Sequence, residues 1–163
     1  HLLSRRQRQM CIRDRNDDVI NAHAMPGAHA ALQAVQDAGL RCALFTNPSF
    51  PQGAIECRMG WGDLADAPFE LVTHMGNTTR CKPDATYYLE QLQVMGLEPH
   101  EVLMVGNDPK RDFPSPDCGI QTAFVGQGKP SRATWRGTME DFARDFNAVV
   151  EAFYEHQVAD ELS

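Results

Sequence analysis

Apolar residues follow two alternating patterns along the chain from Pro26 onward. Segments with apolar residues three or four positions apart predict amphipathic helices, and the short apolar runs between them predict buried strands. The clearest helix begins after Lys82-Pro83 and stops at Gly96, a residue type that commonly ends helices. One face of this helix is predicted to carry Ala85, Tyr88, Leu89, Leu92 and Met95.

The order of these segments predicts a doubly wound α/β fold with a parallel sheet. Strands are expected at 42–45, 69–75, 102–105 and 120–125, and helices at 26–39, 51–60, 83–96 and across Phe142, Phe146, Val149, Val150 and Phe153. Residues 109–118 are expected to form a turn or short helix, because Pro114 and Pro116 interrupt them. Such alternation implies parallel strands with helices on both faces of the sheet.

Length and composition fit one globular domain. The 163 residues suffice for one core, and 42 % of them are hydrophobic and 23 % charged. No apolar run approaches the roughly 20 residues of a membrane helix, so we expect no membrane partner. The cysteines are odd in number and lack CxxC spacing, which favours reduced thiols and a cytoplasmic location. We assign residues 26–155 to the core domain and 156–163 to a polar tail.

The first fifteen residues differ in charge from the rest. Residues 1–15 hold five of the 15 lysines and arginines and only one acid, whereas the whole chain has a net charge of −7. One interpretation is a basic arm that binds nucleic acid. The stretch RRQRQMCIRDR also resembles a translated sequencing adapter of the kind fused to reading frames in metagenomic assemblies. We favour the adapter, exclude this segment from the fold and expect no nucleic-acid partner.

Polar residues follow three of the predicted strands. Thr46 and Asn47 follow the strand at 42–45, Lys82 precedes a helix after the next strand, and Asn107-Asp108 follow the strand at 102–105, with Asp112 one turn further on. In parallel α/β sheets, ligands bind outside the carboxyl ends of the strands, so these groups are expected to share one crevice. Lysine and threonine can bind phosphoryl oxygens, and carboxylates hold a hard cation such as Mg²⁺.

Each of these signals has a purely structural alternative. Thr46-Asn47-Pro48 is also a common turn opening, and Lys82 could be an ordinary surface lysine. Asp108 and Asp112 could simply favour the N-terminus of a short helix. The order and spacing of all three signals on a strand–helix pattern favour the joint site.

These motifs resemble those of the haloacid dehalogenase superfamily, in its phosphatase branch. The resemblance lies in LFTN at 44–47, CKPDATYYLEQL at 81–92 and VLMVGNDPKRD at 102–112, and it extends over residues 25–150. It implies an enzyme in which Thr46 and Asn47 bind and position the transferring phosphoryl group. Lys82 would neutralise charge on that group, and Asp108 and Asp112 would hold Mg²⁺. Asn107 stands where the family pattern has Asp, so either Asn107 or Asp108 would be the direct metal ligand.

The resemblance also identifies a missing element. The family's nucleophile is the first Asp of a DxDx[T/V] motif on the first, central strand, and this sequence contains no such motif. We therefore expect the sheet to lack its first central strand, which with most of a helical cap would lie upstream of Asn16. Residues 16–25 would be the end of that truncated cap or a linker. The fragment would be inactive, since the covalent route needs the nucleophile.

The implied activity of the full-length parent is Mg²⁺-dependent hydrolysis of a small phosphorylated metabolite. Two alternatives stay open at this point. One is a non-catalytic α/β module that binds phosphate or metal, and the other is a hydrolase that resembles 2-haloacid dehalogenases. The sequence indicates no particular oligomeric state.

Overall fold

The computed structural model describes residues 22–128, 130 and 132–161, with side chains to His156. The predictions for the basic segment 1–15, and those for residues 16–21, lie outside the described residues. So do the side chains of the polar tail from position 157 onward.

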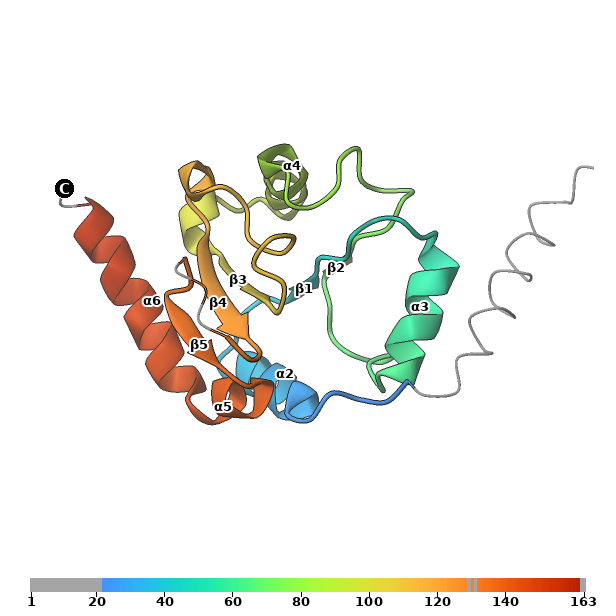
Figure 1. Cartoon of the computed structure of the whole chain (residues 1–163), viewed down its shortest axis with the longest axis horizontal. Helices are drawn as coiled ribbons and strands as arrows, with labels where there is room; N and C mark the ends of the chain where they lie inside the picture. The colour runs from blue at the N-terminus through green and yellow to red at the C-terminus, as the bar shows by residue number, and fades with distance from the viewer. Residues whose placement is uncertain (1–21, 129, 131, 162–163) are drawn as a thin grey trace, which may run out of the picture.

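Helices and strands alternate along the chain, as predicted (Figure 1). The elements are α2 (Ala28–Asp37), β1 (Ala43–Leu44), α3 (Gln52–Trp61), β2 (Leu71–Val72), α4 (Ala85–Met95), η1 (Pro99–Glu101), β3 (Leu103–Gly106), η2 (Pro116–Cys118), β4 (Gln121–Val125), β5 (Trp135–Gly137), α5 (Met139–Arg144) and α6 (Phe146–Glu161).

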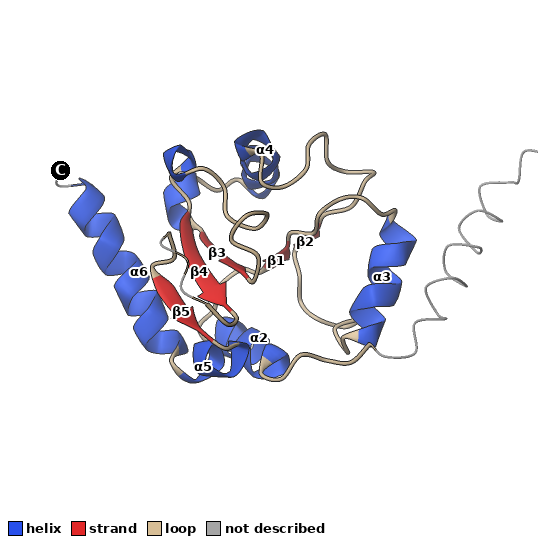
Figure 2. Ribbon diagram, viewed as in Figure 1, coloured by secondary structure: helices blue, strands red, loops and turns tan. Residues whose placement is uncertain are grey.

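All paired strands are parallel, and they form two short sheets (Figure 2). One sheet pairs β1 with β2, and the other has the order β3-β4-β5. In the described part of the chain, β1 and β3 each have a strand partner on one side only. The predicted α/β class is thereby confirmed, and the two short sheets are consistent with the absence of a central strand between them.

Helices cover both faces of the strands. In Figure 1, α4 lies above the strands, and α2 and α5 lie below them. Helix α4 contributes Tyr87, Tyr88 and Leu92 to a core cluster that also packs against Phe45, beside β1, and Met104 of β3. The opposite face holds a second cluster of side chains from α2, β4, α5 and α6: Ala31, Ala123, Val125, Phe142, Phe146 and Val149. Helix α4 therefore packs against β3 and against the residue that directly follows β1.

Helix α4 is rotated relative to the face predicted from its sequence. Leu89 was expected to be buried but is 43 % exposed, whereas Tyr87, which was not assigned to that face, is 0 % exposed. The hydroxyl of Tyr87 finds hydrogen-bond partners inside the protein, so this amphipathic side chain can be buried in place of a leucine. The helix ends before Gly96, which adopts a left-handed conformation with a φ of 66°.

Two further features were not predicted. The first is β5, whose residues Trp135–Gly137 have no alternating apolar pattern and become a strand only by pairing with β4. The second is the division of the last predicted helix into α5 and α6. Thr138 and Asp141 form a reciprocal capping box that starts α5, and Asp145 ends it.

Candidate active site

Thr46 and Asn47 directly follow β1, at its carboxyl end. Thr46 is half-buried and Asn47 is exposed. The Thr46 hydroxyl donates to the carbonyl oxygen of Thr73 at 2.7 Å, and the Thr46 backbone N–H donates to Thr73 Oγ1 at 2.7 Å. The chain after β1 is thus fastened to the chain after β2 by hydrogen bonds to Thr73.

Thr73 and Tyr87, which the sequence analysis did not single out, complete this hydrogen-bond network. Both residues are 0 % exposed. Tyr87 Oη donates to the Thr46 carbonyl oxygen at 2.7 Å and lies 2.9 Å from Thr73 Oγ1. Because the Tyr87 hydrogen goes to a carbonyl oxygen, which can only accept, the Thr73 hydroxyl donates to Tyr87. The three residues therefore form a closed ring of hydrogen bonds. A polar residue at the end of a buried strand was the available sequence signal for Thr73.

Lys82 lies just before α4 and reaches the loop after β3. Its Nζ donates to Asp112 Oδ1 at 2.7 Å, and only 7 % of the Lys82 side chain and 14 % of the Asp112 side chain are exposed. Lys82 is therefore not an ordinary solvent-exposed surface lysine, which was the alternative interpretation of its sequence position. A nearly buried ammonium and carboxylate lie together at the carboxyl end of β3.

Asp112 also organises the loop that we call the acid loop, residues 106–112. Its Oδ2 accepts hydrogen bonds from the backbone N–H groups of Asn107 at 3.0 Å and Asp108 at 2.9 Å. This carboxylate approaches so closely that a Cβ added to Gly106 would lie 2.4 Å from Asp112 Cβ. Glycine at position 106 is thus required by the folded acid loop.

The other two predicted metal ligands lie in the same loop but are more open to solvent. Asn107 is exposed, and 44 % of the Asp108 side chain is exposed. Asp108 Oδ1 accepts from the backbone N–H of Lys110 at 3.0 Å, and Asp108 Oδ2 lies 3.7 Å from Arg111 Nε. The acid loop therefore presents oxygen atoms of one amide and two carboxylates.

Tyr88 connects α4 with the acid loop. Its hydroxyl donates to the carbonyl oxygen of Asp112 at 2.7 Å and to the carbonyl oxygen of Arg111 at 3.1 Å. Burial raises the pKa of the Tyr87 and Tyr88 hydroxyls above the ordinary tyrosine value. Both groups therefore stay protonated and remain hydrogen-bond donors at neutral pH.

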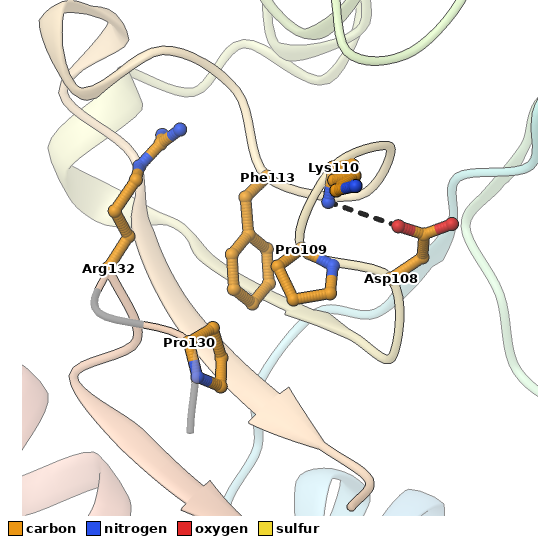
Figure 3. Close-up of a pocket in the computed structure, with 6 residues that line it drawn as sticks. All are labelled: Asp108, Pro109, Lys110, Phe113, Pro130 and Arg132. Carbon is orange, nitrogen blue, oxygen red and sulfur yellow. Dashed lines mark hydrogen bonds between the residues drawn. The ribbon is translucent and has the colours of Figure 1, made fainter. Parts of the chain in front are cut away.

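An open hollow of about 380 Å³ lies beside the acid loop. Figure 3 shows Asp108, Pro109, Lys110 and Phe113 from the loop region opposite Pro130 and Arg132. The dashed line marks the hydrogen bond from the Lys110 backbone to Asp108. The exposed side chains of Lys110 and Arg132 and the carboxylate of Asp108 thus border this hollow.

The structure brings Lys82, Asn107, Asp108 and Asp112 together and joins Thr46 to them through α4. Among the described residues, no three His, Cys, Asp or Glu side chains are grouped so that they could hold a metal ion by themselves. In the same part of the chain, no helix combines the length and apolar character needed to span a membrane.

A model of the haloacid dehalogenase-like hydrolase family matches residues 3–116 of the sequence. No curated protein matches the chain. Because the family match covers more than half of the 163 residues, it establishes family membership.

Several solved structures share the fold of this chain. A β-phosphoglucomutase from Clostridium difficile has a TM-score of 0.67 and 16 % identity, with 94 % of this chain and 65 % of that chain covered. For a predicted phosphoglycolate phosphatase from Haemophilus somnus 129pt, the TM-score is 0.62, the identity 18 % and the coverages 75 % and 56 %. A HAD family hydrolase from Deinococcus radiodurans R1, with bound phosphate and sodium, has a TM-score of 0.62, 20 % identity and coverages of 78 % and 59 %.

The chain spans less than two thirds of the length of each of these structures. At these identities the likeness concerns the fold, whereas the family assignment rests on the sequence model and agrees with the strand-end motifs. The chain belongs to the haloacid dehalogenase-like hydrolase family.

Proposed function

We propose that this chain supplies the phosphate- and metal-binding part of a Mg²⁺-dependent phosphatase for small phosphorylated metabolites. The observation that carries the proposal is the nearly buried Lys82–Asp112 pair at the carboxyl end of β3. A cation in that position can attract a phosphoryl group to the acid loop, since opposite charges interact strongly where water is largely excluded. The phosphatase and the phosphate-bound hydrolase among the structural neighbours support this choice of substrate.

Lys82 and Thr46 would act on the phosphoryl group in different ways. The Lys82 ammonium, held by Asp112, would balance negative charge on the phosphoryl oxygens. Thr46 and Asn47, at the end of β1, would position the group through hydrogen bonds. The Thr46 hydroxyl donates to Thr73 in this structure, so it would have to turn its hydrogen toward a bound phosphoryl oxygen.

The acid loop has the ligand chemistry that Mg²⁺ requires. Asn107, Asp108 and Asp112 offer oxygen atoms, and Mg²⁺ commonly binds one or two carboxylates together with water and substrate phosphate. Asp112 already bonds Lys82 and two backbone N–H groups, whereas Asp108 has the more accessible carboxylate. Asp108 is therefore our choice for the direct ligand, with Asp112 and Asn107 as supporting ligands. A bound Mg²⁺ would reduce the repulsion between an anionic substrate and a carboxylate nucleophile.

The nucleophile would come from outside the described fold. Since the sequence has no DxDx[T/V] motif, we propose that turnover requires a longer protein in which this chain is joined to a strand carrying that motif. The 163-residue chain alone would bind ligand without hydrolysing it.

The test uses p-nitrophenyl phosphate as the substrate of the longer protein. Release of p-nitrophenol should require Mg²⁺, stop on addition of EDTA and be abolished by Lys82→Ala. Arg144→Ala, which removes an exposed cation of α5 away from the site, is the control and should retain most of the activity. Activity that is unaffected by EDTA would refute the metal assignment. Turnover by the 163-residue chain alone would refute the assignment of the nucleophile. Phosphate binding by the longer protein without turnover would favour a non-catalytic module.

A further inference from the structure

Two adjacent tyrosines of α4 contact the two halves of the candidate site separately. Tyr87 Oη donates to the main chain of Thr46 after β1, and Tyr88 Oη donates to the main chain of the acid loop after β3. These strands belong to different sheets. The first turns of one helix therefore link the predicted phosphate-positioning residue with the predicted metal-binding loop.

The packing of these tyrosines leaves little freedom for either hydroxyl. Both side chains are 0 % exposed. Their rings meet edge to face with centroids 5.1 Å apart, and Phe45 packs against both, at 5.9 Å from Tyr87 and 6.3 Å from Tyr88. A ring held on several sides directs its hydroxyl to one place, so each hydrogen bond has a defined direction as well as a defined partner.

Packing alone does not require the hydroxyl groups of Tyr87 and Tyr88. A phenylalanine would fill nearly the same volume, and a buried hydroxyl must recover its lost hydration through hydrogen bonds. Here both hydroxyls donate to backbone carbonyls of predicted site residues, Tyr87 to Thr46 and Tyr88 to Asp112. The Thr73 hydroxyl adds to this arrangement, because it accepts from the Thr46 backbone and donates to Tyr87.

We propose that Tyr87, Thr73 and Tyr88 are positioning residues that set the placement of Thr46 relative to Lys82 and Asp112. Tyr87 and Thr73 fix the Thr46 side of the site, and Tyr88 fixes the acid-loop side. None of the three contacts a phosphoryl group itself. This inference rests on the proposed phosphate-binding function of the site.

The first measurement tests the positioning without any ligand. Amide hydrogen exchange is measured in the 163-residue chain for the wild type, Tyr87→Phe and Tyr88→Phe. Tyr87→Phe should speed exchange at the Thr46 amide and leave the Asp112 amide unchanged, and Tyr88→Phe should do the reverse. A merely structural role would speed exchange at both amides in both variants, and that result would overturn the proposal. Tyr154→Phe, at a half-exposed tyrosine of α6, is the control and should change neither amide.

The second measurement tests the link to ligand binding, with inorganic phosphate as the probe in the presence of Mg²⁺. Tyr87→Phe and Thr73→Val should each weaken phosphate binding about threefold to tenfold, because each removes hydrogen bonds that hold the main chain of Thr46. Thr73→Ser keeps the hydroxyl and should restore binding close to that of the wild type. Unchanged affinity in Tyr87→Phe and Thr73→Val would overturn the positioning role. Absence of phosphate binding in the wild type would instead overturn the proposed function, and the exchange pattern would still decide whether the tyrosines position the two strand ends.

Discussion

Lys82 and Asp112, 30 residues apart in the sequence, form a nearly buried ion pair with 2.7 Å between Lys82 Nζ and Asp112 Oδ1. The second carboxylate oxygen of Asp112 holds the backbone of the acid loop. One carboxylate therefore connects the residue that precedes α4 with the turn that follows β3. Loss of either partner would leave a charge in a place with little access to water.

We expect Lys82→Met to lower the free energy of unfolding by about 3–5 kcal/mol, because it leaves the Asp112 carboxylate buried without a counter-charge. Urea denaturation measures this change. Glu70→Gln removes one partner of the exposed Arg41–Glu70 pair and should cost clearly less stability than Lys82→Met, because water screens that pair. Equal effects of the two substitutions would contradict the burial of the Lys82–Asp112 pair.

Gly106→Ala should lower the free energy of unfolding by about 1–3 kcal/mol, since the new Cβ must displace Asp112. The comparison is Gly60→Ala in α3, where an added Cβ meets no atom within 4 Å. That substitution should raise stability by about 0.5–1 kcal/mol, because alanine is the better helix former. Thermal unfolding of both variants provides the test, and a neutral Gly106→Ala would show that the acid loop is looser than described.

The orientation of α4 can be tested with two leucines of the same helix. Leu92 is 2 % exposed and Leu89 is 43 % exposed. Leu92→Ala should cost about 2–5 kcal/mol, because it leaves a cavity in the core. Leu89→Ala should cost clearly less in the same urea-denaturation assay. A larger loss of stability for Leu89→Ala than for Leu92→Ala would contradict the observed orientation of α4 and would support the helix face predicted from the sequence.

The capping box of α5 should make stability depend on acid pH. The Asp141 carboxylate accepts from the Thr138 backbone N–H at 3.0 Å and from its hydroxyl at 2.8 Å, and it pairs with Arg144. The pKa of Asp141 falls from 3.8 to about 2. The main cause is the hydrogen bond from the Thr138 backbone, followed by the hydrogen bonds from the Thr138 hydroxyl and from Arg144. The ionised Asp141 carboxylate therefore contributes stability that is fully present above pH 3.8. This stability is lost as the pH falls through about 2.

We therefore expect Asp141→Asn to be less stable than the wild type at neutral pH, with a difference that narrows between pH 4 and pH 2. Unfolding midpoints measured across this range provide the test. Glu140→Gln, at the neighbouring exposed acid outside the capping box, is the control. A difference that stays constant from pH 7 to pH 2 would rule out the proposed role of the Asp141 charge.

The residues of the candidate site could be proposed from the sequence, because their positions follow local rules. Apolar runs and helical spacing place Thr46, Lys82 and Asp108 near strand ends or helix starts, and parallel strands bring such ends to one edge. The roles of Thr73 and Tyr87 could not be predicted from the sequence, because their hydrogen bonds join residues 14, 27 and 41 positions apart. No periodicity within a single helix or strand encodes such contacts.

The sequence by itself determined the order of the elements, the parallel α/β class and the ends of α2 and α4, since helix spacing and glycine stops act within a few residues. Only the tertiary structure decided that Trp135–Gly137 becomes β5, that Tyr87 replaces Leu89 in the core and that Asp112 pairs with Lys82. These outcomes depend on which surfaces meet when the helices pack on the strands. Burial then selects, among residues with similar local preferences, those whose polar groups find partners.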